Sequence, residues 1–567
     1  MNLPNIWGAG SIFAFSGLSG PCTLRDAMVG QLMGDFIGVD FDNHAVQLIL
    51  RTHGAHAWAF SIVASDLISG TLNGGAPFVL AFAEQDTVVG CCPERYCLPV
   101  CHGDLLQQAM GNEVQLLIGR SVAYAFAREV REEAVYFVLV RDRDAQQAEL
   151  RAQRMLAKMD IAALQQQKLA FFRAAPQPAA LTAHAERTLL KCYSVMKSQV
   201  YTPEGRIEHR WTTPDRVPHR YLWLWDSVFH SFGNVYIDPA LARESLLAVL
   251  DSQGEDGFIP HMMLPDRASD VTQPPVLAWG FLRLFEKEGD ANLLFSVFER
   301  LKRYLAWNME HRDDNRNGLY EWYVDPNDPG CRCGESGMDN SPRFDAVQRM
   351  DCVDFSCFMA NEMRCMERIA LELGQTQDAA FYAEQYRRTA DAIEAELYDE
   401  KDGRYYDREI ASGQLKRVSA VSSFLPLFAG ACSREHAARL VEDLFDPTTF
   451  GTAVGVPSVA VSDPTFGSDM WRGPVWINYN YMIIRGLRDY GYDDAAERLR
   501  RMTLQTIEKW YAREGSVFEF YDCGGEVSPT LLPRKGAPLR PTDAFVRYPS
   551  IRDYGWTATL YVALRME

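Results

Sequence analysis

Acidic side chains recur in a few irregular segments of the C-terminal part of this 567-residue chain. These acids are Asp226, Glu335, Asp339, Asp345, Asp469, Glu519 and Asp522. Cleavage of a glycosidic bond needs two carboxyl groups, one to protonate the leaving oxygen and one to activate water or attack the sugar. The residue types alone do not select the pair among these seven acids.

Tryptophans gather in the same segments, and of the twelve in the chain only Trp7 and Trp58 precede residue 200. The tryptophans in or beside the irregular segments are Trp223, Trp225, Trp279, Trp322, Trp471 and Trp476. Indole rings stack on the apolar faces of sugars, while neighbouring carboxylates and amides bind hydroxyls. Any single tryptophan could instead anchor the core, so it is their joint placement that predicts a sugar-binding cleft.

Asp226 directly follows Trp225 at the start of a predicted helix. The helix dipole favours the ionised carboxylate at this position. An ionised carboxylate suits the binding of hydroxyls better than general acid catalysis, which requires a proton near neutral pH. The alternative role for Asp226 is that of a helix N-cap without ligand contact.

The elements that must position these residues are mainly helices. The sequence predicts twelve of them: Ala180–Tyr201, Trp225–Ile237, Pro239–Ser252, Pro275–Glu288, Ala291–His311, Cys352–Leu373, Gln375–Leu397, Val418–Phe428, Arg434–Phe445, Trp476–Tyr490, Asp493–Arg513 and Gly555–Glu567. The irregular segments fall between an odd helix and the next even one. In antiparallel hairpins those connections emerge at one end, so we predict a mainly α fold, an (α/α)6 barrel with its cleft at that end.

The chain has a different character before residue 145. Short runs of β-branched and aromatic residues, such as AVQLILRTH and AVYFVLV, alternate with turn signals. This spacing predicts an N-terminal antiparallel β-sandwich over residues 1–145. An Ala/Gln/Leu-rich stretch then predicts a helical linker over 146–178, followed by a catalytic barrel domain over 179–567.

Five motifs occur in order: YLWLWDSVFH, TQPPVLAW, ESGMDNSPRFD, WRGPVWINYNYMIIRGL and VFEFYD. Together they resemble glycoside hydrolase family 63 and its close relatives over residues 180–567. The resemblance implies an exo-acting α-glycosidase that inverts the anomeric carbon. It implies Asp339, of GMDNS, as the general acid and Glu519, of FEF, as the general base, with carboxyl groups roughly 6.5–9.5 Å apart.

The same motifs imply the residues that hold the sugar. The expected substrate-binding set is Trp223, Trp225, Asp226, Gln273, Trp279, Asn340, Arg343, Trp471, Arg472 and Trp476. Purely structural roles remain open for some of them. Trp476 could pack the barrel, and Arg343 could pair with Asp345.

Within this family we expect an α-glucosidase that acts on short oligosaccharides or small α-glucosides. The alternative is a glucosylglycerate or mannosylglycerate hydrolase, whose anionic aglycone would need cations such as Arg216, Arg220, Arg472 or those of LLPRKGAPLRP. A phosphorolytic relative would replace the base by a phosphate pocket, and the retained Glu519 disfavours it. A carbohydrate-binding protein without catalysis is disfavoured because both Asp339 and Glu519 are present.

The net charge of −18, from 57 Lys+Arg and 75 Asp+Glu, disfavours nucleic acid as a partner. No apolar run approaches a membrane span, and the N-terminus lacks the basic region of a secretory signal. The thirteen cysteines lack the paired CxxC spacing of a zinc site, so we expect reduced thiols and a cytoplasmic protein. The expected partner is a small saccharide, while the oligomeric state is left open.

One segment has the beginning of a calcium loop. Asp313, Asn315, Asn317 and Gly318 follow the D-x-N-x-N-G pattern, but Val324 stands where the bidentate acid should be. We therefore expect a simple turn, with a partial calcium site as the alternative. No metal or cofactor is expected to be required.

Overall fold

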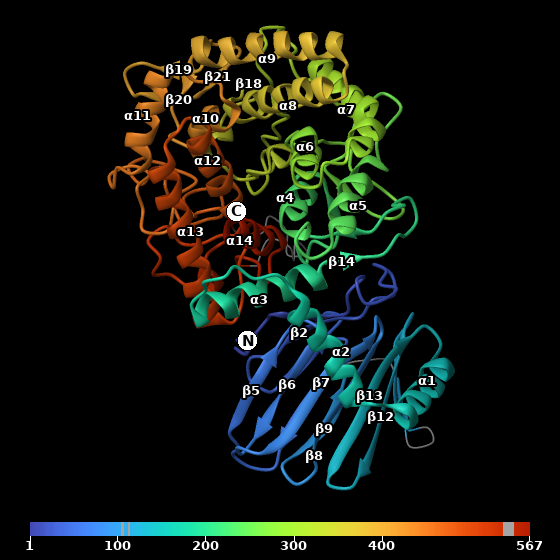
Figure 1. Ribbon diagram of the computed structural model, residues 1–567. Coiled ribbons are helices and arrows are strands. Elements are labelled where there is room, and N and C mark those ends of the chain that lie inside the picture. Colours follow the sequence, from blue (N-terminus) through green and yellow to red (C-terminus); the bar gives the residue numbers. More distant parts are fainter. Residues whose placement is uncertain (104–106, 111–113, 537–548) are drawn as a thin grey trace.

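The computed structural model describes residues 1–103, 107–110, 114–536 and 549–567. Antiparallel sheets form its N-terminal part and helices dominate the rest, as the sequence predicts (Figure 1). The sheets lie below the helical region in the view of Figure 1, and α3 (Ala183–Ser198) runs along the boundary.

Two antiparallel sheets make up the N-terminal part. The first has the strand order β1 (Ile12–Ala14), β2 (Val29–Leu32), β3 (Gly38–Phe41), β4 (Val46–Thr52) and β9 (Cys97–His102). The second has the order β10 (Gln107–Met110), β11 (Val114–Ile118), β12 (Ala123–Arg131), β13 (Ala134–Asp142), β8 (Thr87–Pro93), β7 (Ala76–Glu84), β6 (Leu67–Leu72) and β5 (Trp58–Val63). The Phe82 ring of β7 lies 4.9 Å from Phe13 and 6.2 Å from Phe41, so the two sheets share one core.

The predicted linker consists of two helices, α1 (Ala145–Lys158) and α2 (Ile161–Ala174), which start at Asp144 and Asp160. Each aspartate accepts a backbone N–H as an N-cap. The buried face of α1 packs on the second sheet, opposite the face that meets the first sheet. Because both faces of this sheet are covered, strands such as β13 are apolar almost throughout.

The twelve predicted helices all occur. They are α3, α4 (Leu224–Asn234), α5 (Pro239–Leu250), α6 (Leu277–Glu288), α7 (Ala291–His311), α8 (Val353–Glu372), α9 (Thr376–Glu396), α10 (Leu425–Ala429), α11 (Arg434–Leu444), α12 (Ile477–Asp489), α13 (Asp493–Glu514) and α14 (Gly555–Met566). The prediction of one helix over Val418–Phe428 is wrong in extent, since α10 follows a 3₁₀ turn at Val421–Phe424. Pro426 is tolerated only in the first turn of a helix, and Gly430 ends α10 in a left-handed conformation.

Six helices pack in a closed sequence of neighbours. Contacts run from α4 to α6, α8, α10, α12 and α14, and α14 packs back against α4. On the outside α5, α7, α9, α13 and α3 each pack against one of these six. Alternate helices are therefore inner and outer, and the connections that enter the inner helices emerge at one end of the ring.

Short strands occur in the connections between helices. They are β14 (Val200–Tyr201) with β15 (Trp211–Thr212), β16 (Leu222–Trp223) with β17 (Met262–Met263), β19 (Tyr398–Asp399) with β20 (Arg404–Tyr405), and β18 (Met350–Asp351) with β21 (Asp407–Glu409) and β22 (Leu415–Lys416). The pairs β16–β17 and β18–β21 link connections that lead into different inner helices, so they brace that end of the ring.

All thirteen cysteines lie within the described residues, and each has a free thiol. No helix in the described part of the chain is long and apolar enough to cross a membrane.

A buried charge cluster joins the sheets to the helices. Asp66 lies 2.9 Å from Lys168 of α2 and 2.7 Å from Lys197 of α3, and all three side chains are less than 5% exposed. Burial alone would raise the pKa of Asp66, but the two lysines outweigh it and lower that pKa to about 2.

We expect Asp66→Asn to lower the free energy of unfolding by about 3–5 kcal/mol, because two buried lysines then lose their counter-charge. The unfolded carboxyl has a pKa of about 3.9, so the wild-type advantage is complete above that pH. It declines as the pH falls toward 2, where the folded carboxyl is protonated. Urea unfolding at several pH values measures this, with exposed Asp35→Asn as the control. A loss no larger than that of the control would contradict this role.

Candidate active site

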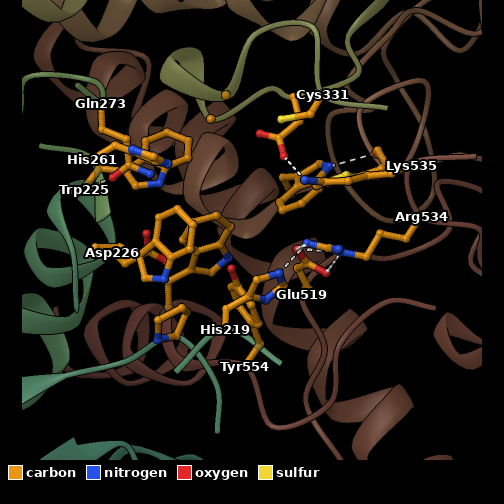
Figure 2. Close-up of a pocket in the computed structure, with 18 residues that line it drawn as sticks. His219, Trp225, Asp226, His261, Gln273, Cys331, Glu519, Arg534, Lys535 and Tyr554 are labelled. Atoms are coloured by element: carbon orange, nitrogen blue, oxygen red, sulfur yellow. Dashed lines mark hydrogen bonds and ion pairs between the residues drawn. The ribbon is translucent and has the colours of Figure 1, made fainter. Parts of the chain in front are cut away.

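A cavity of about 170 Å³ lies at the elaborated end of the helical ring (Figure 2). It is lined by Pro214, His219, Trp223, Trp225, Asp226, His261, Gln273, Cys331, Gly334, Gly337, Asp339, Met470, Trp476, Glu519, Arg534, Lys535, Tyr554 and Trp556. These residues come from the connections that enter α4, α6, α8, α12 and α14 and from the first turns of α4 and α14. Five odd-to-even connections thus meet around one cavity, as the sequence predicts.

The two acids expected to be catalytic both line this cavity. Each of them pairs with a cationic side chain, and the two cations are neighbours in one loop. Lys535 Nζ lies 2.5 Å from Asp339 Oδ2, and Arg534 Nε lies 3.1 Å from Glu519 Oε2. Figure 2 shows Arg534 and Lys535 reaching in from the side opposite Asp226. The cavity therefore holds two carboxylates and two cations close together.

The pairing sets the protonation of Asp339. Burial would raise the pKa of this carboxyl, but the charge of Lys535 and its hydrogen bond outweigh burial and lower the pKa. The lowered pKa favours the ionised form of Asp339. A general acid needs a proton, so Asp339 can take that role only when Lys535 no longer compensates its charge.

Asp226 lies in the first turn of α4, as predicted, but its expected ionisation is wrong. Burial raises the pKa of Asp226 well above its usual range, and the charges of Asp215, Glu519 and Asp339 add to that effect. These terms outweigh the backbone N–H groups at the helix start. The raised pKa favours the protonated form of Asp226.

Three buried polar atoms of the lining have no hydrogen-bond partner among the described residues. They are Asp226 Oδ1, Trp223 Nε1 and Trp556 Nε1. Buried polar groups are rarely left unpaired in proteins. Hydroxyl groups of a ligand would satisfy both indole donors and the carboxyl group.

Close packing fixes Trp225 at the wall of the cavity. A Cβ added to Gly337, whose φ is +70°, would lie 2.3 Å from the Trp225 ring. Gln273 Oε1 accepts the Trp225 backbone N–H at 3.1 Å and so caps the start of α4. Only glycine at 337 lets the acid-bearing loop approach this ring.

Three further expected residues, Trp471, Asn340 and Arg472, lie behind the lining. Trp471 stacks on Trp476 with ring centroids 3.8 Å apart and planes at 4°, so Trp471 supports the ring that faces the cavity. Asn340 accepts the Trp471 N–H at 3.0 Å, and its carbonyl oxygen accepts from Arg472 at 3.1 Å. These bonds tie the loop of Asp339 to the loop that enters α12.

Arg343 does not line the cavity and does not pair with Asp345. It is 2% exposed and bridges Asp354 of α8 and Asp407 of β21, the latter at 2.9 Å. Asp345 instead pairs with Arg472 at 2.7 Å. Among the described residues Cys352, Asp354 and Asp407 could together hold a metal ion, but the Arg343 guanidinium already compensates both carboxylates.

Trp279 lies away from the cavity. Its ring packs 4.7 Å from Phe232 and 4.8 Å from Phe428 inside the ring of helices. The backbone N–H of Trp279 donates to Glu362, which caps α6. The rest of its surface borders a different cavity among the C-terminal halves of α6, α8 and α12.

The other four acids of these segments do not line the cavity, and three of them have partners elsewhere. Glu335 accepts the N–H groups of Thr272 and Tyr323 at 3.2 and 2.9 Å, and Asp522 accepts those of Glu526 and Val527 at 2.9 and 3.1 Å. Asp345 pairs with Arg472, and Asp469 lies outside the cavity. Three of the seven acids thus face the cavity.

Several lining residues were not predicted, namely His219, His261, Lys535, Arg534 and Tyr554. His219 and Tyr554 lie just before inner helices, and this position in the sequence could have identified them as lining residues. Arg534 and Lys535 belong to LLPRKGAPLRP, noted in the sequence only as a source of rim cations; its residues from 537 lie outside the described part. Burial lowers the pKa of His261 to about 4, so this ring is neutral near pH 7.

The DDNRNG segment forms a turn. Asp313 accepts the backbone N–H of Asn317 at 2.9 Å and of Gly318 at 3.1 Å, and both asparagine amides, of Asn315 and Asn317, donate to Asp351 at 3.0 Å. The side chains of the motif therefore stabilise the turn itself, and a partial calcium site stays the alternative.

Comparison with known proteins places this site in a class. The chain is 27% identical over 399 residues to a mannosylglycerate hydrolase of Thermus thermophilus, covering 55% of this chain and 91% of that protein. It is 24% identical to the glucosylglycerate hydrolase of Mycolicibacterium hassiacum, covering 55% and 88%. A solved mannosylglycerate hydrolase of glycoside hydrolase family 63, also from Thermus thermophilus, matches with a TM-score of 0.55 and 25% identity, covering 66% and 99%.

The protein is accordingly a glycoside hydrolase, as its motifs imply. More narrowly, residues 219–526 match the mannosylglycerate hydrolase MGH1-like glycoside hydrolase domain, and the chain belongs to that family. These relatives favour the glycerate glycosides, the alternative of the sequence analysis, over its expectation of an α-glucosidase.

We expect Gly337→Ala to displace Trp225 and to lower kcat/KM for a glycoside substrate. The matched control is Gly374→Ala, because Gly374 also has φ +70° but open space where the Cβ would lie. Both variants carry a left-handed alanine, at a cost of roughly 1–2 kcal/mol. The melting temperatures of the two variants measure the backbone strain that they share. Equal kinetics for the two variants would refute the contact with Trp225 as a constraint on the site.

Proposed function

We propose that this protein hydrolyses an α-glycoside of a small hydroxy acid, of the glucosylglycerate or mannosylglycerate type, with inversion at the anomeric carbon. The observation that carries the proposal is the pairing of Asp339 and Glu519 with Lys535 and Arg534 in one cavity. Two acids supply the hydrolytic chemistry, and two cations supply recognition of an anionic aglycone.

The proposed scaffold is an (α/α)6 barrel over residues 179–567, preceded by a β-sandwich and the two helices that cover it. The cyclic packing of α4, α6, α8, α10, α12 and α14 supports the barrel. Free thiols at all thirteen cysteines of the described chain support a reducing, cytoplasmic compartment.

The size of the cavity favours a small substrate and exo-action. Its volume of about 170 Å³ is below the roughly 300–1,000 Å³ of drug-sized ligand pockets. Trp223, Trp225 and Trp476 offer apolar surface for a sugar ring, while Asp226 and Trp556 offer polar atoms to its hydroxyls. A single sugar with a short aglycone matches this lining.

In the proposed reaction Asp339 donates a proton to the glycosidic oxygen, and Glu519 removes a proton from the water that attacks the anomeric carbon. An incoming carboxylate competes with Asp339 for Lys535. Once Lys535 binds the aglycone, the remaining burial of Asp339 raises its pKa toward the protonated form that an acid requires. Binding of the anionic substrate thereby favours the protonated form of Asp339.

The relatives' names support this aglycone, since one solved mannosylglycerate hydrolase holds D-glycerate together with Tris. The choice between glucose and mannose is left to experiment. A phosphorolytic reaction is disfavoured because Glu519 occupies the position of the base.

We expect Asp339→Asn and Glu519→Gln each to lower kcat by about 10²–10⁴-fold, because each removes one proton-transfer group. Release of sugar from glucosylglycerate and mannosylglycerate measures the loss. Asp522→Asn is the control, since this nearby acid accepts two backbone N–H groups and the amide keeps one acceptor oxygen.

Proton NMR of the first product tests the stereochemistry of the same reaction. Inversion of an α-glycoside yields the β-sugar first. Initial release of the α-sugar would rule out the assigned general base, and undiminished activity of Asp339→Asn would rule out the assigned acid.

We expect Lys535→Gln to lower the preference for a glycerate glycoside over the neutral glycerol glycoside by about tenfold to a hundredfold. A lost charge-assisted hydrogen bond is worth about 1.5–3 kcal/mol. The ratio of the two kcat/KM values measures the preference, with exposed Lys158→Gln as the control. An unchanged ratio would exclude Lys535 as an aglycone ligand.

The same variant should also change the pH profile on the neutral substrate. Lys535 lowers the pKa of Asp339, so its removal raises that pKa. A general acid loses activity as the pH rises through its pKa, and the alkaline limb of kcat/KM therefore moves to higher pH in Lys535→Gln. A shift to lower pH would contradict the pairing of Lys535 with the acid.

A further inference from the structure

A second cavity, of about 490 Å³, forms a groove between the two domains. Its walls come from the β1–β2 connection, β2 and β3 on one side and from residues 216–221 and the loop after β17 on the other. The charged residues around it are Arg25, Asp40, Asp42, Arg141, Arg216, Arg220 and Arg267. Five arginines and two aspartates line the groove, so its lining carries an excess of positive charge in a chain of net charge −18.

Two of these arginines are already engaged. Arg141 Nε pairs with Asp42 Oδ2 at 3.1 Å. Arg216 is fully buried, stacks over the Tyr201 ring and donates to backbone carbonyl oxygens, among them that of Val200 at 3.0 Å. Their charge contributes to the potential, but their donors are taken.

The other three arginines, Arg25, Arg220 and Arg267, have no ion-pair partner among the residues that the structure describes. They come from three separate segments, one in the N-terminal domain and two in the helical domain. Arg25 and Arg267 are exposed and Arg220 is half-buried. Guanidinium groups with uncommitted donors around one groove suit a phosphate or carboxylate, which accepts paired hydrogen bonds.

The groove also has features for the rest of a ligand. Asp40 Oδ1 is buried in its wall without a hydrogen-bond partner among the described residues. The Tyr221 ring lines the opposite wall. A hydroxyl acceptor and an aromatic ring in one groove are groups that can bind a sugar.

The groove adjoins the β16–β17 strand pair, because its lining residues Tyr221 and Leu264 directly flank these strands. The Tyr221 ring meets the edge of Trp223 at 5.9 Å, and Trp223 lines the catalytic cavity. The N-terminal wall of the groove, by contrast, precedes residues 219–526, which match the family domain. The groove therefore combines the catalytic domain with a part of this chain outside that match.

From this placement we propose that the interdomain groove is a second ligand site, which takes a small anionic sugar of the hexose phosphate class. The anion binds Arg25, Arg220 and Arg267, hydroxyls donate to Asp40, and the sugar face packs on Tyr221. The contact of Tyr221 with Trp223 transmits occupancy of the groove to the catalytic cavity.

Titration calorimetry with glucose 6-phosphate tests this site in the full-length protein. Inorganic phosphate probes the anion alone, and glucose probes the sugar alone. The groove variants are Arg220→Gln and Arg267→Gln, with exposed Arg154→Gln of α1 as the matched control. Because Lys535 and Arg534 form another cationic site, Lys535→Gln separates binding in the catalytic cavity from binding in the groove. Thermal unfolding shows that each variant is folded.

We expect glucose 6-phosphate to bind the wild type more tightly than phosphate, and each groove variant to weaken it by about tenfold or more. Lys535→Gln and Arg154→Gln should leave that affinity within about twofold. Absence of binding at about 10 mM glucose 6-phosphate, or binding that both groove variants leave unchanged, overturns the proposal. So does binding that is lost in Lys535→Gln.

Discussion

The site depends on the buried bridge that Arg343 makes between Asp354 and Asp407. Arg343 stands four residues after Asp339, so it anchors the acid-bearing loop to the start of α8 and to β21. Two carboxylates buried around one guanidinium are held together only while that charge is present. The loop can therefore place Asp339 at the cavity without a long helix or sheet of its own.

Further contacts connect the anchored loop of Asp339 to the neighbouring loops. Asn340 binds the backbone of Trp471, and Trp471 supports Trp476 from behind. On the other side Gly337 allows the loop to pack against Trp225. A chain of contacts thus connects Asp339 with Trp476 at the start of α12 and with Trp225 at the start of α4. A change in any of these contacts displaces the other residues.

Much of this arrangement follows from the sequence. Helical periodicity located all twelve helices, and the position of the irregular segments between odd and even helices predicted which connections would meet. The motifs selected Asp339 and Glu519 from seven acids. The sequence could not assign Arg343 to Asp407, because that contact spans 64 residues and depends on how β21 folds back. The sequence also could not show that Trp279 packs among the helices, since a tryptophan of the core and a tryptophan of the cleft have the same sequence pattern.

Electrostatics was the least predictable part because it depends on burial and distant partners together. A helix start alone indicates an ionised Asp226, yet burial beside Asp339 and Glu519 reverses the outcome. In the empty cavity Lys535 and Arg534 compensate two of the three acids, and the third keeps its proton. The net charge of −18 therefore says little about this site, because its local balance is close to neutral. In the proposed reaction an anionic substrate competes for those cations, which couples its binding to the protonation of Asp339.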